Sequence, residues 1–186
     1  MHNSNAPQPL RRRLLFGMAA VPLLARAPLS RAAFEAPRAL DFLHTHTDEK
    51  LSVVYFDKGA YVPDALRAVE NLLRDFRTGE SHPIDAQLLD ILHTLRTAVG
   101  GGTFQVISAY RSPTTNATLA GKSNGVARNS LHMLGKAIDV RLGSRDTAQL
   151  RDAAIALARG GVGYYPASDF VHLDTGRVRR WGPQKS

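Results

Sequence analysis

The chain has 186 residues, of which 44% are hydrophobic and 22% are charged, and it contains no cysteine. One globular domain with a sizeable core fits this length and composition, whereas disulfides and thiolate metal ligands are excluded. The net charge of +8 would suit nucleic-acid binding, but five of the arginines lie in residues 1–32, which hold no acidic residue. Removing these five charges leaves +3, so we predict no nucleic-acid partner.

Residues 1–33 have the pattern of an export signal. Three arginines at 11–13 precede an uncharged apolar run at 14–25, and small residues follow. This order is typical of a signal peptide, and the apolar run is too short for a comfortable membrane span. The consecutive arginines before Leu14 resemble a twin-arginine signal. The alternatives to an export signal are a disordered basic tail and a membrane anchor. We therefore predict a domain at 34–186, without a transmembrane segment in the mature chain.

The residue pattern in the first half of that domain predicts a strand pair and two helices. Residues 41–62 are rich in β-branched and aromatic side chains around a turn at 57–59. Pro63 can open a helix at its first position. A second helical pattern begins at residues 82–85 and ends at the glycines 100–102.

In the second half, strands and helices alternate without a regular βαβ repeat. The patterns predict a strand at 104–109, a polar loop at 118–130, a strand at 136–142, a helix at 147–159, strands at 162–165 and 170–174, and a basic tail at 176–186. This order favours an α+β fold with a central antiparallel sheet flanked by helices.

Three polar side chains stand out from these elements. Asp139 lies on the strand face opposite Ile138 and Val140, and His132 comes shortly before the same strand. His172 lies on a later strand, where it shares a face with Asp174. A lone His or Asp is usually structural, but two imidazoles and one carboxylate suit a catalytic zinc that keeps a fourth position for water.

The segment 130–139 also resembles a family signature. Its fixed positions are Ser130, His132, Gly135, Ala137 and Asp139, with a later His172. This pattern is similar to that of zinc peptidases acting on bacterial cell walls, a group with the hedgehog/DD-peptidase fold that includes D-alanyl-D-alanine carboxypeptidases. The segment 108–112, with Arg111, is similar to the arginine motif of that group. Over roughly residues 41–182 the chain most resembles exported proteobacterial penicillin-insensitive murein endopeptidases.

The resemblance implies roles for individual residues. His132, Asp139 and His172 match the ligands of one Zn²⁺ per chain. The family places a catalytic carboxylate three residues before the last ligand, which here is Asp169. The strand pattern, not the resemblance, adds Asp174: it shares a face with His172 and is the competing base, or it orients an imidazole by accepting its N–H.

Two further side chains complete the predicted site. Arg111 matches the family's arginine and could hold a substrate carboxylate or the developing oxyanion; a surface salt bridge is the alternative. Ser130 could bind either the ligand loop or the substrate.

The resemblance implies a periplasmic zinc endopeptidase that cleaves peptide cross-links of peptidoglycan. The alternatives are a carboxypeptidase or dipeptidase with the same zinc site, and a non-catalytic zinc-containing domain that binds the cell wall. The peptide stems of murein are the expected partner, and the sequence indicates no oligomeric state.

Overall fold

A mixed sheet of eight strands organises the part of the chain that the structure describes, in the order β3-β2-β1-β4-β5-β7-β6-β8. The structure is a computed structural model and describes residues 35–122, 126–143 and 145–183. The predicted export signal at 1–33 lies outside these residues. No helix within them is both long enough and apolar enough to span a membrane.

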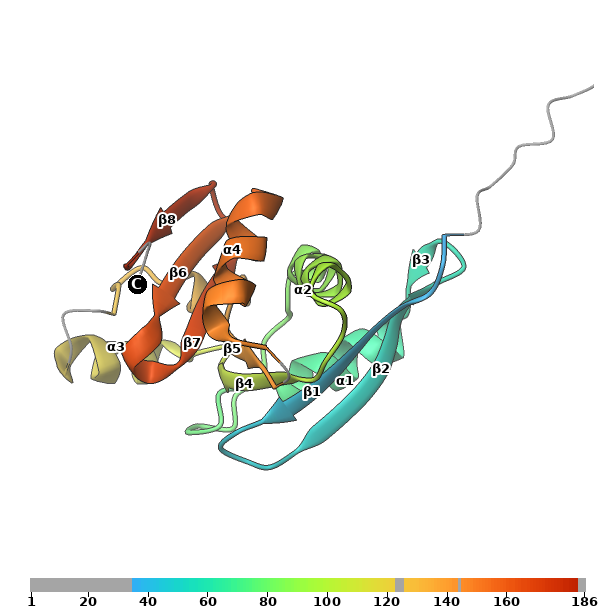
Figure 1. Cartoon of the computed structure of the whole chain (residues 1–186). Helices are drawn as coiled ribbons and strands as arrows, with labels where there is room; N and C mark the ends of the chain where they lie inside the picture. Colours follow the sequence, from blue (N-terminus) through green and yellow to red (C-terminus); the bar gives the residue numbers. More distant parts are fainter. Residues whose placement is uncertain (1–34, 123–125, 144, 184–186) are drawn as a thin grey trace, which may run out of the picture. The chain divides into compact units, whose positions relative to one another are not determined.

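The elements follow the chain in a simple order (Figure 1). The strands are β1 (Arg38–His44), β2 (Lys50–Asp57), β3 (Ala60–Tyr61), β4 (Phe104–Ser108), β5 (Ala137–Leu142), β6 (Gly161–Tyr165), β7 (Phe170–Asp174) and β8 (Arg179–Trp181). The helices are α1 (Pro63–Leu72), α2 (Ala86–Ala98), α3 (Pro113–Lys122) and α4 (Thr147–Leu157), with short 3-10 turns η1 (Leu131–Leu134) and η2 (Pro166–Ser168).

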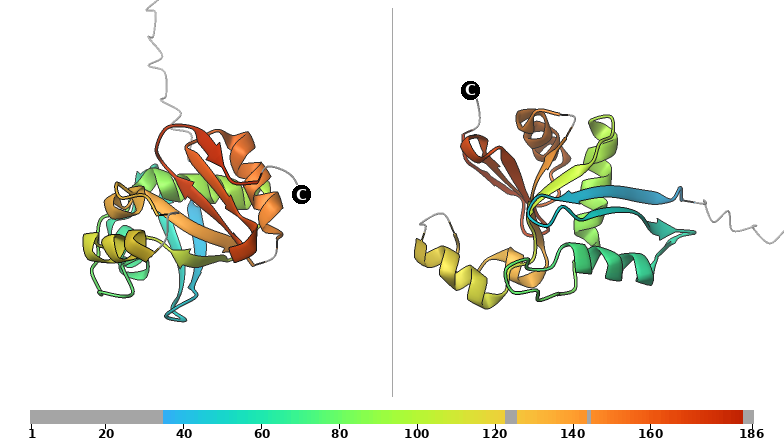
Figure 2. Two further views of the ribbon diagram at one scale, coloured as in Figure 1. Left: turned by 90° about the vertical axis from the view of Figure 1, so that its left-hand side faces the viewer. Right: turned by 90° about the horizontal axis from the view of Figure 1, so that it is seen from below.

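The predicted α+β class is confirmed, and most neighbouring strands pair antiparallel as expected. Two pairs are parallel, β1 with β4 and β6 with β8. The sheet is therefore mixed. Helices α2 and α4 lie on one face of the sheet, whereas α1 and α3 lie on the other (Figure 2, right).

The hydrophobic core includes residues of α1, α2 and α4, and one part of it forms where the apolar strand faces meet α2 and α4. Ile138 and Val140 of β5 are fully buried there, on the face opposite Asp139, together with Leu88 and Leu92 of α2. Alternation along β5 thus separates the core from a polar site, as the sequence pattern predicts.

Two elements differ from the sequence prediction. The predicted loop at 118–130 begins inside α3, a polar helix that starts at Pro113. Ser112 caps this helix because its Oγ accepts a hydrogen bond from the backbone N–H of Thr115 at 3.2 Å. The predicted basic tail contains β8, which exists because residues 179–181 pair with β6.

Candidate metal centre

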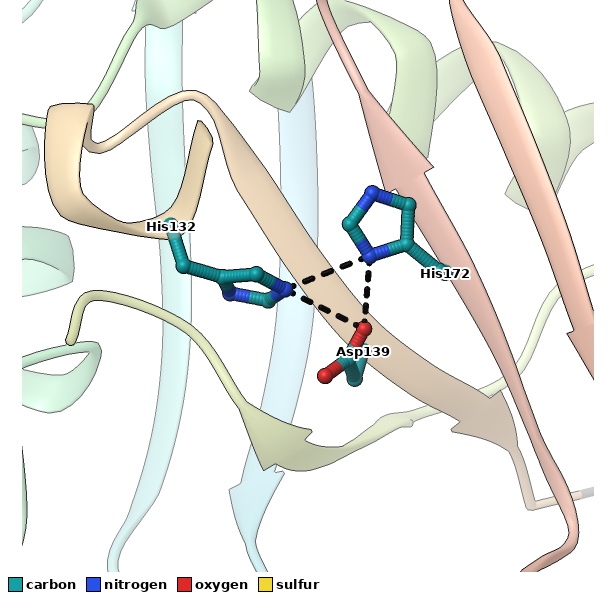
Figure 3. A group of neighbouring side chains, drawn as sticks. All are labelled: His132, Asp139 and His172. Carbon is teal, nitrogen blue, oxygen red and sulfur yellow. Dashed lines mark hydrogen bonds and ion pairs between the residues drawn. The ribbon is translucent and has the colours of Figure 1, made fainter. Parts of the chain in front are cut away.

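Strand register brings the three predicted ligands together on the face of β5 away from the core. β5 pairs antiparallel with β7, and Asp139 is directly opposite His172 in that ladder. His132 lies in η1, immediately before β5, and is 1% exposed. The three side chains converge from η1, β5 and β7 (Figure 3).

The distances among these side chains are those of one compact cluster. His172 Nδ1 is 2.8 Å from Asp139 Oδ1 and 3.2 Å from His132 Nε2, and the last atom is 3.3 Å from Asp139 Oδ1. Among the described residues, this is the one group of three or more His, Cys, Asp or Glu side chains with ligand atoms close enough to share a metal ion.

The outer nitrogen of each imidazole already has an acceptor. His132 Nδ1 is 2.6 Å from the carbonyl oxygen of Ala109, so this nitrogen carries the proton and donates. His172 Nε2 donates in the same way to Asp174 Oδ2 at 3.0 Å. The inner nitrogens therefore present lone pairs towards each other and towards a carboxylate oxygen. Arg111 Nη2 lies 3.1 Å from His132 Nε2, but His172 Nδ1 and Asp139 Oδ1 face each other and need a cation or a proton between them. The set of three fits zinc in type and number.

The pKa values in the cluster follow from burial and mutual contact. Burial lowers the pKa of His132 and favours the neutral imidazole that a metal requires. Burial alone would raise the pKa of Asp139, but the adjacent imidazoles hold it well below its usual range. Burial also opposes the charge on His172, yet its contacts with Asp139 and Asp174 leave its pKa raised. A proton on His172 is consequently the natural competitor of a metal ion here.

The Asp174 carboxylate is buried and hydrogen-bonded on both oxygens. Its side chain is fully buried, and it accepts hydrogen bonds from the backbone N–H groups of Gly161 and Gly176 at 3.1 and 2.9 Å. Arg179 adds two more from Nη1 and Nη2, at 2.9 and 2.6 Å. Burial would raise the pKa of Asp174, but hydrogen bonds from His172 and Arg179 keep it below its usual range. The carboxylate is thus a fixed, charged support for His172.

Arg111 reaches the cluster from the end of β4. Its Nη2 donates to Asp139 Oδ2 at 2.6 Å and lies 3.1 Å from His132 Nε2, and its Nε donates to the Ser108 hydroxyl at 2.9 Å. The side chain is only 11% exposed, so the surface salt bridge considered above does not describe it. Arg111 instead holds the second carboxylate oxygen of a predicted ligand.

Ser130 and Gly135 shape the turn that carries His132. The Ser130 hydroxyl accepts a hydrogen bond from the backbone N–H of His132 at 3.3 Å, so it caps η1. Gly135 has a φ of +63°, and a Cβ there would lie 2.0 Å from the carbonyl oxygen of Pro83. Only glycine fits both constraints, which explains its fixed place in the signature.

Asp169 lies apart from the cavity at this cluster. The cavity has a volume of about 360 Å³ and is lined by Arg111, Val126, Ala127, Asn129, Ser130, Leu131, His132, Asp139, Tyr165, Phe170, His172, Arg179 and Trp181. The Asp169 carboxylate instead accepts hydrogen bonds from Arg141 and Thr147, both at 3.1 Å, and is 59% exposed. The sequence suggested Asp169 by its position along the chain. It did not predict that Arg179 and Trp181 line the cavity, because no sequence pattern indicates β8.

Comparisons with known proteins agree with this architecture. Residues 32–181 match the sequence profile of a family described as peptidoglycan L,D-endopeptidase MepK. A probable peptidoglycan L,D-endopeptidase MepK of Haemophilus influenzae is 37% identical over 163 residues, covering 87% of this chain and 88% of the relative. The peptidoglycan L,D-endopeptidase MepK of Escherichia coli K12 is 39% identical over 166 residues, covering 89% of this chain and 90% of the relative.

Proposed function

The chain belongs to the peptidoglycan L,D-endopeptidase MepK family, and from that premise we propose that it is a zinc-dependent murein endopeptidase that hydrolyses peptide cross-links of peptidoglycan. The observation that supports this most directly is the convergence of three lone-pair acceptors, on His132, Asp139 and His172, at the wall of one cavity. The names of the relatives add the bond type, a peptide bond between an L and a D centre.

The residues of the cluster have two roles in this proposal, which are to bind the metal ion and to orient the imidazoles. His132, Asp139 and His172 would hold the ion, while Ala109 and Asp174 fix which imidazole nitrogens face it. When bound, zinc supplies Lewis acidity, which polarises a scissile carbonyl and makes water a stronger nucleophile near pH 7.

Arg111 orients both the ligand set and the substrate in this proposal. Its Nε and Nη2 hold Ser108 and Asp139. Its remaining guanidinium nitrogen, Nη1, can donate to a substrate carboxylate or to the oxygen that becomes negative during hydrolysis.

Asp169 is the proposed proton acceptor, and in this role its carboxylate must exchange its present hydrogen bonds for a water molecule. Its carboxylate must leave Arg141 and Thr147 to reach a water molecule in the cavity. Asp174 is the poorer base because both of its oxygens already accept hydrogen bonds while fully buried. If Asp169 is the base, Asp169→Ala lowers kcat by at least ~100-fold without changing zinc affinity. A variant that digests sacculi at the wild-type rate would remove this assignment.

We propose that the mature chain acts on peptidoglycan in the periplasm and that it is exported through the twin-arginine pattern at 11–13. Changing Arg12 and Arg13 to lysine should leave the chain in the cytoplasm when cell fractions are compared. Secretion of that variant at the normal level would contradict a twin-arginine route.

The deciding experiment is digestion of purified sacculi by the zinc-loaded and by the chelated protein, with fragments identified by mass spectrometry. We expect the loaded protein to convert cross-linked fragments to monomers and the chelated protein to do nothing. Release of single terminal amino acids would indicate a carboxypeptidase. Binding to sacculi without any cleavage would indicate a non-catalytic domain.

A further inference from the structure

The cavity has an aromatic wall that the metal cluster does not require. Trp181 of β8, the only tryptophan in the chain, lines the cavity beside His172, and their ring centroids are 5.1 Å apart. Tyr165 and Phe170 continue the wall as a stacked pair with centroids 4.6 Å apart. The three residues come from different strands: Tyr165 ends β6, Phe170 begins β7, and Trp181 ends β8. β8 is the edge strand beside β6 (Figures 1 and 2).

The position of the Trp181 ring is built into the sheet. Gly163 of β6 pairs with His172 on one side and with Trp181 on the other. A Cβ at Gly163 would lie 2.5 Å from two carbons of the indole, so the ring occupies the space that a side chain would take. The absence of a side chain at 163 therefore allows the indole to reach His172.

Two polar contacts fix the orientation of the indole. Its Nε1 donates to the hydroxyl of Tyr165 at 2.8 Å. The guanidinium of Arg179 lies 5.0 Å from the ring centroid and is itself held by Asp174. A partly exposed indole with its one donor satisfied presents apolar carbons to the cavity.

The cavity is also lined by the polar side chains of Arg111 and Ser130, which contact His132. A substrate next to the metal cluster therefore meets both hydrogen-bond donors near His132 and an aromatic face near His172. We propose that Trp181 is a specificity-determining residue that packs against the aliphatic side chain of the stem-peptide residue beside the scissile bond. This inference rests on the proposed endopeptidase function.

The closeness of the wall to His172 favours a peptide occupant over a sugar. Aromatic faces also stack on sugar rings, but the glycan joins the stem peptide several residues away from a cross-link. The group that meets an indole about one ring's width from His172 is consequently the residue at the cleaved bond.

The test compares two sugar-free cross-linked peptides that differ at one position. One carries a long aliphatic side chain next to the scissile bond, and the other carries alanine there. We expect wild type to prefer the first by ~10- to 100-fold in kcat/KM, and Trp181→Ala to erase this preference by raising KM on the first peptide alone. Zinc affinity should stay unchanged, and Val178→Ala, at an exposed apolar site of the neighbouring loop, should behave as wild type.

Gly163→Ala offers an independent variant that keeps the tryptophan. The added methyl group must displace the indole, so this variant should lose the same preference as Trp181→Ala. Because Trp181 is the only tryptophan, its emission also reports binding directly. Adding the first peptide to the metal-free protein should shift the emission maximum to shorter wavelength, and the alanine peptide should not.

Several outcomes would overturn the inference. An equal loss on both peptides, or weakened zinc binding, would make Trp181 a support of His172 alone. A loss seen only with glycan-bearing fragments would assign the wall to the sugar. If wild type cleaved no substrate, the proposed function would fail, yet the emission shift would still decide whether the wall binds the aliphatic chain.

Discussion

Two carboxylates in this fold, the half-buried Asp90 and the buried Asp139, have opposite surroundings. Asp90 of α2 accepts hydrogen bonds from Arg38 at 2.7 Å, Tyr55 at 3.0 Å and Tyr61 at 2.6 Å. Asp139 accepts one bond from Arg111, and its other oxygen faces the inner nitrogens of two histidines. Both clusters hold an acid among polar groups, but the side chains that contact Asp90 are all donors. The comparison shows that a metal site is identified by surplus acceptors rather than by residue types alone.

The sharpest way to break this comparison is Asp139→Asn. The amide removes a negative charge and can turn a donor towards the two imidazoles, so the ion loses a ligand. We expect loss of bound zinc and a fall in endopeptidase activity of at least ~1,000-fold. Metal analysis and fragment release from sacculi measure both effects. Full zinc content with normal activity in this variant would refute the proposed ligand set.

Asp174→Asn tests the support behind a ligand. The neutral amide holds the N–H of His172 less firmly, and we expect zinc affinity to fall ~10- to 100-fold. Competition with a chromogenic chelator measures the dissociation constant. Asp152→Asn changes an exposed carboxylate paired with Arg151 and serves as the control, with unchanged affinity. Equal affinities in all three proteins would mean that Asp174 supports the fold only.

Asp90→Asn should show the reverse profile. We expect the free energy of unfolding to fall by about 1–3 kcal/mol because three donors, of which Tyr55 is buried, lose a charged acceptor. Activity and zinc affinity should not change. Urea denaturation monitored by circular dichroism measures the loss. A variant that also lost zinc would indicate that the two clusters are coupled.

The pH dependence of the Asp90 cluster has a defined sign. Burial would raise the pKa of Asp90, but the hydrogen bonds from Tyr61, Arg38 and Tyr55 leave it lowered. Its stabilisation is therefore complete above the unfolded-state pKa of about 4 and is lost as the pH falls through the folded value. The difference in unfolding free energy between wild type and Asp90→Asn should be constant near neutrality and shrink below about pH 4.

Tyr61→Phe gives the smallest expected effect, about 1 kcal/mol, because one partly exposed hydrogen bond is lost. The hydrogen bond to Asp90, with burial, raises the pKa of Tyr61 to about 12. This stabilisation is present below the unfolded-state pKa of about 10 and disappears as the pH rises towards 12. Unfolding curves of both proteins at pH 8 and pH 11 should converge at the higher value, and a constant difference would contradict it.

The sequence was sufficient to predict the ligand strands but not their surroundings. Alternation along β5 and β7 placed Asp139 and His172 on polar faces, and the register of those strands then joined them. The wall at Trp181 could not be foreseen, because three residues of a basic segment become a strand only by pairing with β6. The Asp90 cluster was equally hidden, since its donor Arg38 is 52 residues away in the chain.

Asp169 shows a different limit of sequence reasoning. Its position three residues before His172 suggested a base, but the residue ends η2 in a left-handed turn with a φ of +50°. Such a turn decides where a short carboxylate points, and spacing along the chain does not encode it. Here the carboxylate points towards Arg141 and Thr147.

The place of β5 in the middle of the sheet has a consequence for how an ion enters and leaves. β5 is hydrogen-bonded to β4 and β7, and β7 is hydrogen-bonded to β5 and β6. The backbone at Asp139 and at His172 therefore cannot shift without breaking two ladders. Binding and removal of the metal ion should then leave the backbone of the sheet unaltered. In hydrogen–deuterium exchange, the backbone amides of β5 and β7 should exchange only through global unfolding. Their exchange rates should be equally slow with and without the ion.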